Sequence, residues 1–237
     1  MKNNVQLTIL ILVSSLLLGC DTYNKEEFKK LTQNAYDEIR ANTKIKGNYC
    51  FYLGSVKFPY TDIPSSNEDS RWEGWNKAKL IKTLPLFAEI GLLTRQPVDG
   101  KEGLYHYDLT DLGREYQYED IDSRDVEPIY DNSFCYGPIK VIKVRDVSEK
   151  TYERGLSGYN ETQITVKINY QVVNTPEWVI NNQDKLKAVY DSSSVRLPDV
   201  TYPQSLLYIK GKDGKLYNKS SSYFLMQPSG KLLTDKE

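Results

Sequence analysis

An apolar segment opens the chain and constrains where the rest can fold. Lys2 precedes an apolar run from Val5 to Leu18, which is shorter than the roughly 18 to 20 residues that a transmembrane helix needs. A charged start followed by such a run is typical of a secretory signal. We therefore expect residues 1–19 to be removed and the remainder to fold outside the cytoplasm. The alternative, an uncleaved N-terminal anchor, exposes the remainder on the same side.

The end of the run, Leu17-Leu18-Gly19-Cys20, resembles the lipobox of bacterial lipoprotein precursors. The resemblance implies cleavage before Cys20, a diacylglycerol on its sulfur and an acyl chain such as palmitate on the new amino group. Each buried methylene contributes about 0.8 kcal/mol, so two or three chains anchor a protein stably. The resemblance thus implies a lipid-anchored, periplasm-facing protein of the bacterial cell envelope. Asp21 resembles the residue that retains lipoproteins in the inner membrane, a signal that applies in enteric bacteria.

Composition favours a folded body behind the anchor. Of 237 residues, 39% are hydrophobic and 12% aromatic, enough for one large or two small domains. Removing residues 1–19 takes away one of 31 basic residues and none of 32 acidic ones, so the net charge moves from −1 to about −2. This balance gives no bulk electrostatic reason to bind nucleic acid.

Two cysteines, Cys50 and Cys135, remain once Cys20 is assigned to lipid. An oxidising compartment favours a disulfide between them. The bridge would enclose about 85 residues and stabilise the fold by about 4 kcal/mol. Two buried free thiols are the alternative, because a sequence does not give the distance between the Cα atoms.

The first half predicts helix, turn and hairpin. Lys25 to Ala41 has the periodicity of an amphipathic helix, and Pro59 to Asn67 reads as a loop suited to recognition. A second helical stripe runs from Asn76 to Ile90 and stops at Gly91, a residue that favours helix C-termini. Extended segments around Leu92-Leu93-Thr94 and Leu104 to Leu109 flank a glycine-containing turn, and Thr110 can cap a short helix through Tyr116.

This order over residues 72–118 resembles the end of a winged-helix domain. In winged helices that bind DNA, the helix that matches Asn76 to Ile90 enters the major groove. The basic residues at matching positions are Lys77, Lys79, Lys82, Arg95 and Lys101. The secretory signal places them away from the chromosome. We therefore expect no nucleic-acid partner, and a fold reused for protein interaction.

The second half predicts strands. The later part of acidic Glu115 to Pro128 is interpreted as a linker, and Ile139 to Val147 and Gln163 to Val173 alternate like strands. A helical face follows Pro176 as far as Tyr190. Lys212-Asp213-Gly214 indicates a hairpin and Tyr223 to Met226 a last strand. We therefore predict an α+β protein: signal peptide 1–19, winged-helix-like domain 20–127, and a smaller α+β domain 128–237 with a mainly antiparallel sheet.

Motifs for catalysis are scarce. His106 is the only histidine, so any histidine-based triad has to use it, but its place between two tyrosines on a predicted strand favours a solvent-facing side chain. Gly155-Leu156-Ser157-Gly158 lacks the last glycine of a nucleophile elbow and precedes a strand. No spacing resembles a metal site or a cofactor loop. We expect no cofactor, no bound metal and no enzyme activity.

Tyrosine is abundant, with 19 in the chain. Exposed tyrosines suit recognition, whereas alternating tyrosines on strands pack into sheets. Tyr105 and Tyr107, with Lys77 and Lys82, are the candidate binding residues. Trp72, Trp75 and Trp178 are expected in the core or at a domain interface. The predicted function is a non-catalytic protein-binding module, either an assembly or secretion accessory or an immunity or resistance protein. The alternative is an envelope hydrolase with carboxylates in an interdomain cleft.

Overall fold

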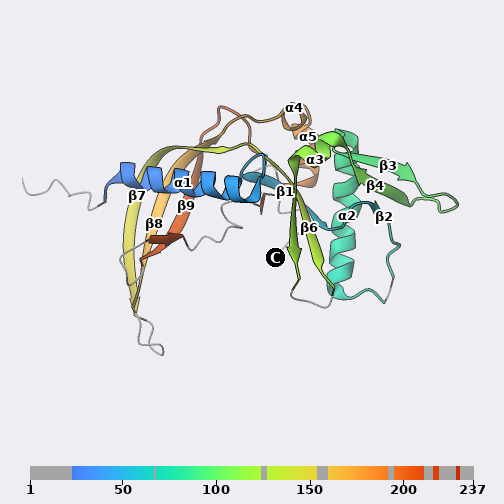
Figure 1. Cartoon of the computed structure of the whole chain (residues 1–237), viewed down its shortest axis with the longest axis horizontal. Helices are drawn as coiled ribbons and strands as arrows, with labels where there is room; N and C mark the ends of the chain where they lie inside the picture. Colours follow the sequence, from blue (N-terminus) through green and yellow to red (C-terminus); the bar gives the residue numbers. More distant parts are fainter. Residues whose placement is uncertain are drawn as a thin grey trace, which may run out of the picture.

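The computed structural model describes residues 23–66, 68–123, 127–153, 160–191, 195–210, 216–218 and 228–229 (Figure 1). The fold is α+β with mainly antiparallel sheets, as predicted. The helices are α1 (Lys25–Thr43), α2 (Arg71–Ile90), α3 (Asp111–Tyr116), α4 (Glu177–Ile180) and α5 (Gln183–Val189). The strands are β1 (Tyr49–Ser55), β2 (Tyr60–Thr61), β3 (Leu93–Pro97), β4 (Tyr105–Leu109), β5 (Gln117–Asp122), β6 (Ile129–Tyr136), β7 (Ile139–Glu153), β8 (Asn160–Val172), β9 (Tyr202–Lys210), β10 (Leu216–Asn218) and β11 (Pro228–Ser229).

The central sheet has the order β11-β1-β6-β5 and contains the disulfide. Cys50 on β1 lies directly opposite Cys135 on β6, their Cα atoms are 3.9 Å apart and their sulfur atoms are bonded. The predicted pairing is therefore confirmed. The bridge joins neighbouring strands of one sheet, although the sequence places it between two domains.

A second sheet, β10-β9-β8-β7, packs one face against α1. Phe28 lies edge-on to Tyr208 of β9 at 6.2 Å between ring centroids, and Thr32 shares a buried hydrogen bond with the same tyrosine. Figure 1 shows the β7–β8 hairpin projecting well beyond α1. The burial of this helix face explains why the amphipathic pattern of Lys25 to Ala41 predicted α1 correctly.

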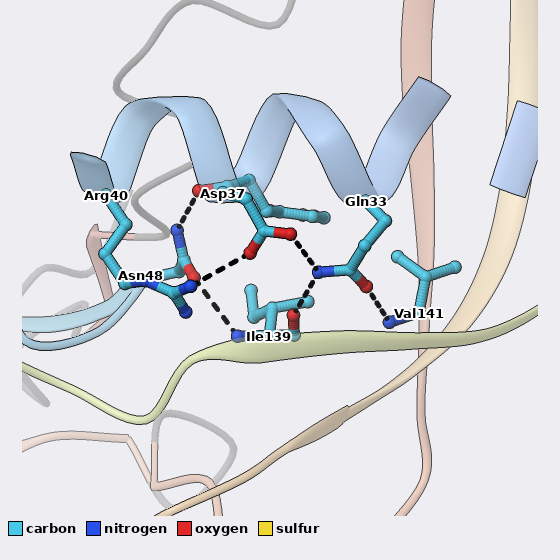
Figure 2. A network of polar contacts seen from close by, with 7 residues as sticks. Gln33, Asp37, Arg40, Asn48, Ile139 and Val141 are labelled. Carbon is cyan, nitrogen blue, oxygen red and sulfur yellow. Dashed lines mark hydrogen bonds and ion pairs between the residues drawn. The ribbon is translucent and has the colours of Figure 1, made fainter. Parts of the chain in front are cut away.

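Amide side chains attach α1 to the edge of β7 (Figure 2). The Gln33 amide donates to the Ile139 carbonyl at 3.0 Å and accepts from the Val141 N–H at 2.8 Å. Asn48 accepts from the Ile139 N–H at 3.1 Å and donates to the Tyr36 carbonyl at 3.0 Å. These contacts take the place of a neighbouring strand and satisfy an otherwise open sheet edge.

Helix α2 and a third sheet, β2-β4-β3, form the other end of the molecule (Figure 1). The helix begins with a capping box between Ser70 and Glu73 and ends at Gly91, which is left-handed with φ 91°. The Thr110 hydroxyl accepts from the Gly113 N–H at the start of α3, as predicted. The predicted helix, hairpin and short helix are thus present, while a winged-helix domain as a whole is not shown.

Several elements differ from the sequence interpretation. Residues 117–122 form strand β5, paired with β6, within the acidic stretch that gave no strand signal. The boundary predicted between residues 127 and 128 falls between these two paired strands. The helix expected after Pro176 is two short helices, α4 and α5, separated at Asn181 and Asn182.

Some predictions lie outside the described residues. They are the lipobox with Cys20 and Asp21, Gly155-Leu156-Ser157-Gly158, Lys212-Asp213-Gly214 and the strand Tyr223 to Met226. Within the part of the chain that is described, no helix is long and apolar enough to cross a membrane.

Candidate functional site

An open cleft lies where the start of α2 meets the end of β1 and the start of β6. Its volume is about 600 Å³, within the range of about 300–1,000 Å³ typical of ligand pockets. The lining residues are Ser55, Val56, Lys57, Trp72, Glu127, Pro128, Ile129 and Tyr130. We call this space the tryptophan cleft.

Two tryptophans of α2 are exposed at this cleft and near it. The exposed fraction is 48% for Trp72, which lines the cleft, and 45% for Trp75, one turn further along. The expectation that both lie in the core or at an interface is wrong, whereas Trp178 is buried as expected. The reason is position along the helix, because the buried residues of α2 begin only at Asn76.

The polar contacts of Asn76 and the backbone of Gly54 fix α2 against β1. The Asn76 amide accepts from the Ser55 N–H at 2.8 Å and donates to the Ser55 carbonyl at 2.7 Å. Gly54 has φ 131°, and a Cβ there would lie 2.9 Å from the Asn76 Oδ1 atom, so the close approach of helix and strand requires glycine. The cleft wall is therefore held by backbone contacts.

Lysines stack on the aromatic rings at and beside the cleft. The Lys79 ammonium lies 3.9 Å from the centroid of Trp75 and 4.5 Å from that of Tyr52, with only 5% of the lysine exposed. The Lys57 ammonium lies 4.7 Å from the Tyr130 centroid. Such cation–π contacts contribute roughly 0.5–2 kcal/mol. They restrict the rings and so reduce the entropy lost when a partner packs on them.

One oxygen of a carboxylate next to the cleft residue Tyr130 already bonds two hydroxyl groups. Asp131 accepts hydrogen bonds from the Tyr52 hydroxyl at 2.7 Å and from the Ser55 hydroxyl. Glu127 is the one carboxylate among the described lining residues. The paired carboxylates that a glycosidase-like hydrolase needs are thus not seen among them. Likewise, no group of three or more His, Cys, Asp or Glu residues in the described segments could hold a metal ion.

A smaller pocket of about 240 Å³ lies on the other flank of α2, against the predicted recognition loop. Its lining residues are Tyr60, Asp62, Ile63, Pro64, Ser65, Lys77, Leu80, Ile81, Gly103 and Leu104. We call it the Asp62 pocket. The Asp62 carboxylate accepts from the Tyr105 N–H at 3.0 Å, and burial raises the pKa of this carboxyl group.

The structure brings three of the four predicted binding residues near the Asp62 pocket. Lys77 lines it, Tyr105 is bonded to Asp62 through its backbone, and Tyr107 is buried, with an exposed fraction of 1%. Burial, followed by the negative charge of Asp62, raises the pKa of Tyr107 to about 12. Lys82 is half-buried on α2 and lines neither of these cavities.

The remaining candidate residue is His106, whose ring shares a hydrogen bond with the Thr61 hydroxyl at 2.9 Å across paired strands β2 and β4. It faces neither cavity. His106 lies on strand β4, as the sequence predicted.

Comparison with known proteins gives no relative: no family model, no curated protein and no solved structure matches this chain. The site therefore rests on its own geometry. Sequence patterns missed Ser55, Lys57, Tyr130 and Asp131, because nothing in the sequence indicates that β1 ends and β6 begins beside α2. The clustering of Trp72 and Trp75 before the apolar stripe of α2 was the one available signal.

Proposed function

We propose that the protein is a lipid-anchored module of the bacterial cell envelope that binds another envelope protein without catalysis. The tryptophan cleft is the contact surface. The observation on which the proposal depends is the pair of half-exposed tryptophans at the start of α2: Trp72 lines an open cleft, and Trp75, one turn away, is held against Lys79. Tryptophan and tyrosine are enriched among the residues that dominate binding energy in protein interfaces.

The arrangement of the molecule supports this proposal. Only the segment Asp21 to Asn24 separates Cys20 from α1 in the sequence. Helix α1 has 19 residues and is therefore about 28 Å long. Figure 1 shows that α1 begins at the end of the molecule opposite to α2. A lipid on Cys20 would thus hold one end at the bilayer and present the cleft at the other end, toward the periplasm.

The winged-helix resemblance gives a second reason. We infer that α2, β3, β4 and α3 form a winged-helix-like unit that serves as a protein-interaction scaffold. Three of the five basic residues at positions that contact DNA in such units make internal contacts here. Lys77 is paired with Asp69 at 2.7 Å, Lys79 lies on two rings and Arg95 lies 3.5 Å from the Tyr105 centroid.

Site-specific crosslinking in intact cells tests the proposal. A photoreactive amino acid replaces Trp72 in the full chain, and the matched control places it at Tyr152, an aromatic residue of β7 with 40% exposure. We expect one envelope protein to be crosslinked from position 72 and not from position 152. Equal crosslinking from both positions, or none from position 72 under several growth conditions, would contradict the proposal.

Measurement of the affinity of alanine variants for the crosslinked protein gives a quantitative test of the same proposal. Truncation of a central tryptophan costs at least about 2 kcal/mol in a typical interface, which corresponds to about thirtyfold in Kd. For the crosslinked protein we expect Trp72→Ala and Trp75→Ala each to weaken binding to this extent. Tyr152→Ala, on β7 and away from the cleft, should change Kd by less than about threefold. Similar losses for all three variants would place the contact elsewhere.

A further inference from the structure

We propose that the Asp62 pocket is a second binding site, which takes one basic side chain, arginine or lysine, from the bound protein. The stem packs on the apolar wall and the cationic end pairs with Asp62. The assignment of a protein as the source of this side chain rests on the proposed function. The chemistry of the pocket, an alkyl stem with a cationic end, is argued from its own residues.

The pocket has an apolar wall and rim. Leu80 and Leu104 form part of the wall, and the large side chains of Ile63 and Ile81 are 60% and 65% exposed beside it. Isoleucine is one of the residue types that are most often buried. Two exposed isoleucine side chains at one pocket opening form an apolar surface that a bound group can cover. A hydrocarbon stem that crosses this rim would cover both.

Asp62 provides the charge at the side of β4. One oxygen, Oδ2, accepts from the Tyr105 N–H, and the ion pairs of the described residues do not include Asp62. Its negative charge is felt by the neighbouring rings. Burial is the largest cause of the raised pKa of Tyr107 and of Tyr60, and the charge of Asp62 raises both further.

The cations nearby have other partners. Lys77, which lines the pocket, is bonded to the Asp69 carboxylate at 2.7 Å and to the Pro64 carbonyl at 3.3 Å. Arg95 stacks on the Tyr105 ring, and its positive charge partly offsets the effect of burial on the pKa of Asp62, but the ion pairs of the described residues do not join the two. Asp62 therefore has room for an incoming donor, and an ion pair in a partly desolvated pocket is stronger than one on an open surface.

Size selects a side chain over a free ligand. The volume of about 240 Å³ lies below the range of about 300–1,000 Å³ of small-molecule sites. A cavity of about 150 Å³ accommodates a group as large as benzene. The Asp62 pocket thus has space for one long side chain, and an anchor residue that fills such a pocket is a common feature of protein interfaces.

Nuclear magnetic resonance titration of the full chain in detergent micelles, with isotope-labelled tyrosine, tests the chemistry. The reporter is the Tyr105 amide, because it donates to Asp62. The probes are butylguanidinium, butanol with the stem alone, and guanidinium with the charge alone. We expect saturable shifts with butylguanidinium at concentrations about tenfold lower than with either control.

Variants separate charge from shape. Asp62→Asn keeps an oxygen for the Tyr105 N–H and removes the charge, so it should weaken butylguanidinium binding about tenfold. The matched control is Asp99→Asn, on the exposed turn of the same hairpin, which should leave binding unchanged. Equal responses to butanol and butylguanidinium, or equal binding by both variants, would overturn the proposal.

A short capped peptide with a central arginine identifies the source of the cation. Binding of this peptide, lost in its citrulline counterpart, supports a protein side chain. Binding of butylguanidinium without the peptide would overturn that part and assign the pocket to a free alkyl cation. Crosslinking from position 72 is independent of these results. It therefore shows whether a negative titration reflects a wrong pocket or a wrong function.

Discussion

At the scale of one residue, the half-buried carboxyl group of Asp62 in the candidate site lowers the stability of the folded chain. Its carboxyl group is half-buried, and burial raises its pKa above the ordinary value. A raised carboxyl pKa means that the folded chain binds protons more tightly than the unfolded chain, so this group lowers stability as pH rises through that pKa. Proteins retain such groups at functional sites and lose stability in exchange.

We therefore expect Asp62→Asn to raise the melting temperature at neutral pH, with the gain shrinking as pH falls toward the unfolded pKa of about 3.9. Asp69→Asn should behave oppositely. Lys77 lowers the pKa of Asp69, so this group stabilises the fold above the unfolded pKa and the benefit is lost as pH falls through the folded pKa. Melting curves of both variants from about pH 2 to pH 7 check the signs, because the benefit of Asp69 is lost below the unfolded pKa of about 3.9. Parallel shifts would contradict this account.

Residue-scale prediction from sequence succeeded where local chemistry decides the outcome. The Cys50–Cys135 pairing followed from a count of cysteines, and the cap at Thr110 from side-chain chemistry. The tryptophan cleft could not be found in this way. Its members come from α2, β1 and β6, and their proximity depends on sheet pairing that no local pattern encodes.

At the scale of elements, side-chain amides join the helices to the backbone of the strands that they cover. Gln33 on α1 does this at the edge strand β7, and Asn76 on α2 does it at Ser55, the last residue of β1. Each amide donates to a strand carbonyl and accepts from a strand N–H. At β7 these bonds replace those of a missing strand, and at both strands they help to fix the position of the helix along its sheet.

Loss of one such amide leaves two buried backbone groups without partners. We expect Gln33→Ala to lower the free energy of unfolding by about 1–3 kcal/mol. The control is Gln171→Ala, whose amide bonds the Thr201 hydroxyl at 3.2 Å on the exposed side of β8 and should change stability by no more than about 0.5 kcal/mol. Urea unfolding measures both. Equal effects would show that water replaces Gln33 at the edge of β7.

Element prediction followed the strength of each pattern. The periodic apolar residues of α1 and α2 gave both helices, because one face of each is buried. Strand β5 was missed because it is a sheet edge whose exposed positions carry Glu119 and Asp120. Its position is set by pairing with β6, which overrides its weak strand propensity.

The disulfide joins two neighbouring strands that are far apart in the sequence. It closes a loop with a sequence separation of 85 residues that contains α2 and the third sheet. We expect the double variant Cys50→Ser, Cys135→Ser to lose about 4 kcal/mol of unfolding free energy. Cys20→Ser is the control and should leave this free energy unchanged. A loss much below about 2 kcal/mol would mean that the unfolded chain keeps structure within the loop.

At the scale of the whole molecule, buried tyrosines join the sheets into one core. The largest fully buried side chains include Tyr36, Tyr49, Tyr107, Tyr136, Tyr170, Tyr190 and Tyr208, which come from α1, from all three sheets and from the end of α5. Tyr136 of β6 stacks on Phe51 and lies edge-on to Trp178 of α4. The abundance of tyrosine in the sequence thus reflects mainly core packing.

This core makes stability depend on pH at the alkaline side. Burial raises the pKa of Tyr107 to about 12 and raises those of Tyr136 and Tyr190 well above the ordinary value. A group whose folded pKa is raised contributes stability that is intact below the unfolded pKa, about 10 for tyrosine, and lost as pH rises past it. Above about pH 10 these hydroxyl groups ionise more readily in the unfolded chain, and this ionisation lowers the free energy of the unfolded state relative to the folded one.

We therefore expect one cooperative unfolding transition above about pH 10, in which tyrosinate absorbance and the loss of near-ultraviolet circular dichroism coincide. The chain unfolded in guanidinium is the control and should titrate broadly around the ordinary tyrosine pKa. Phenylalanine at position 190 isolates one contributor. Tyr190→Phe removes the buried ionisable group and also its hydrogen bond to the Tyr52 carbonyl at 2.9 Å, so it should lower stability at neutral pH and flatten the alkaline fall. Tyrosines that ionise near pH 10 while the dichroism stays native would show that the core opens locally, sheet by sheet.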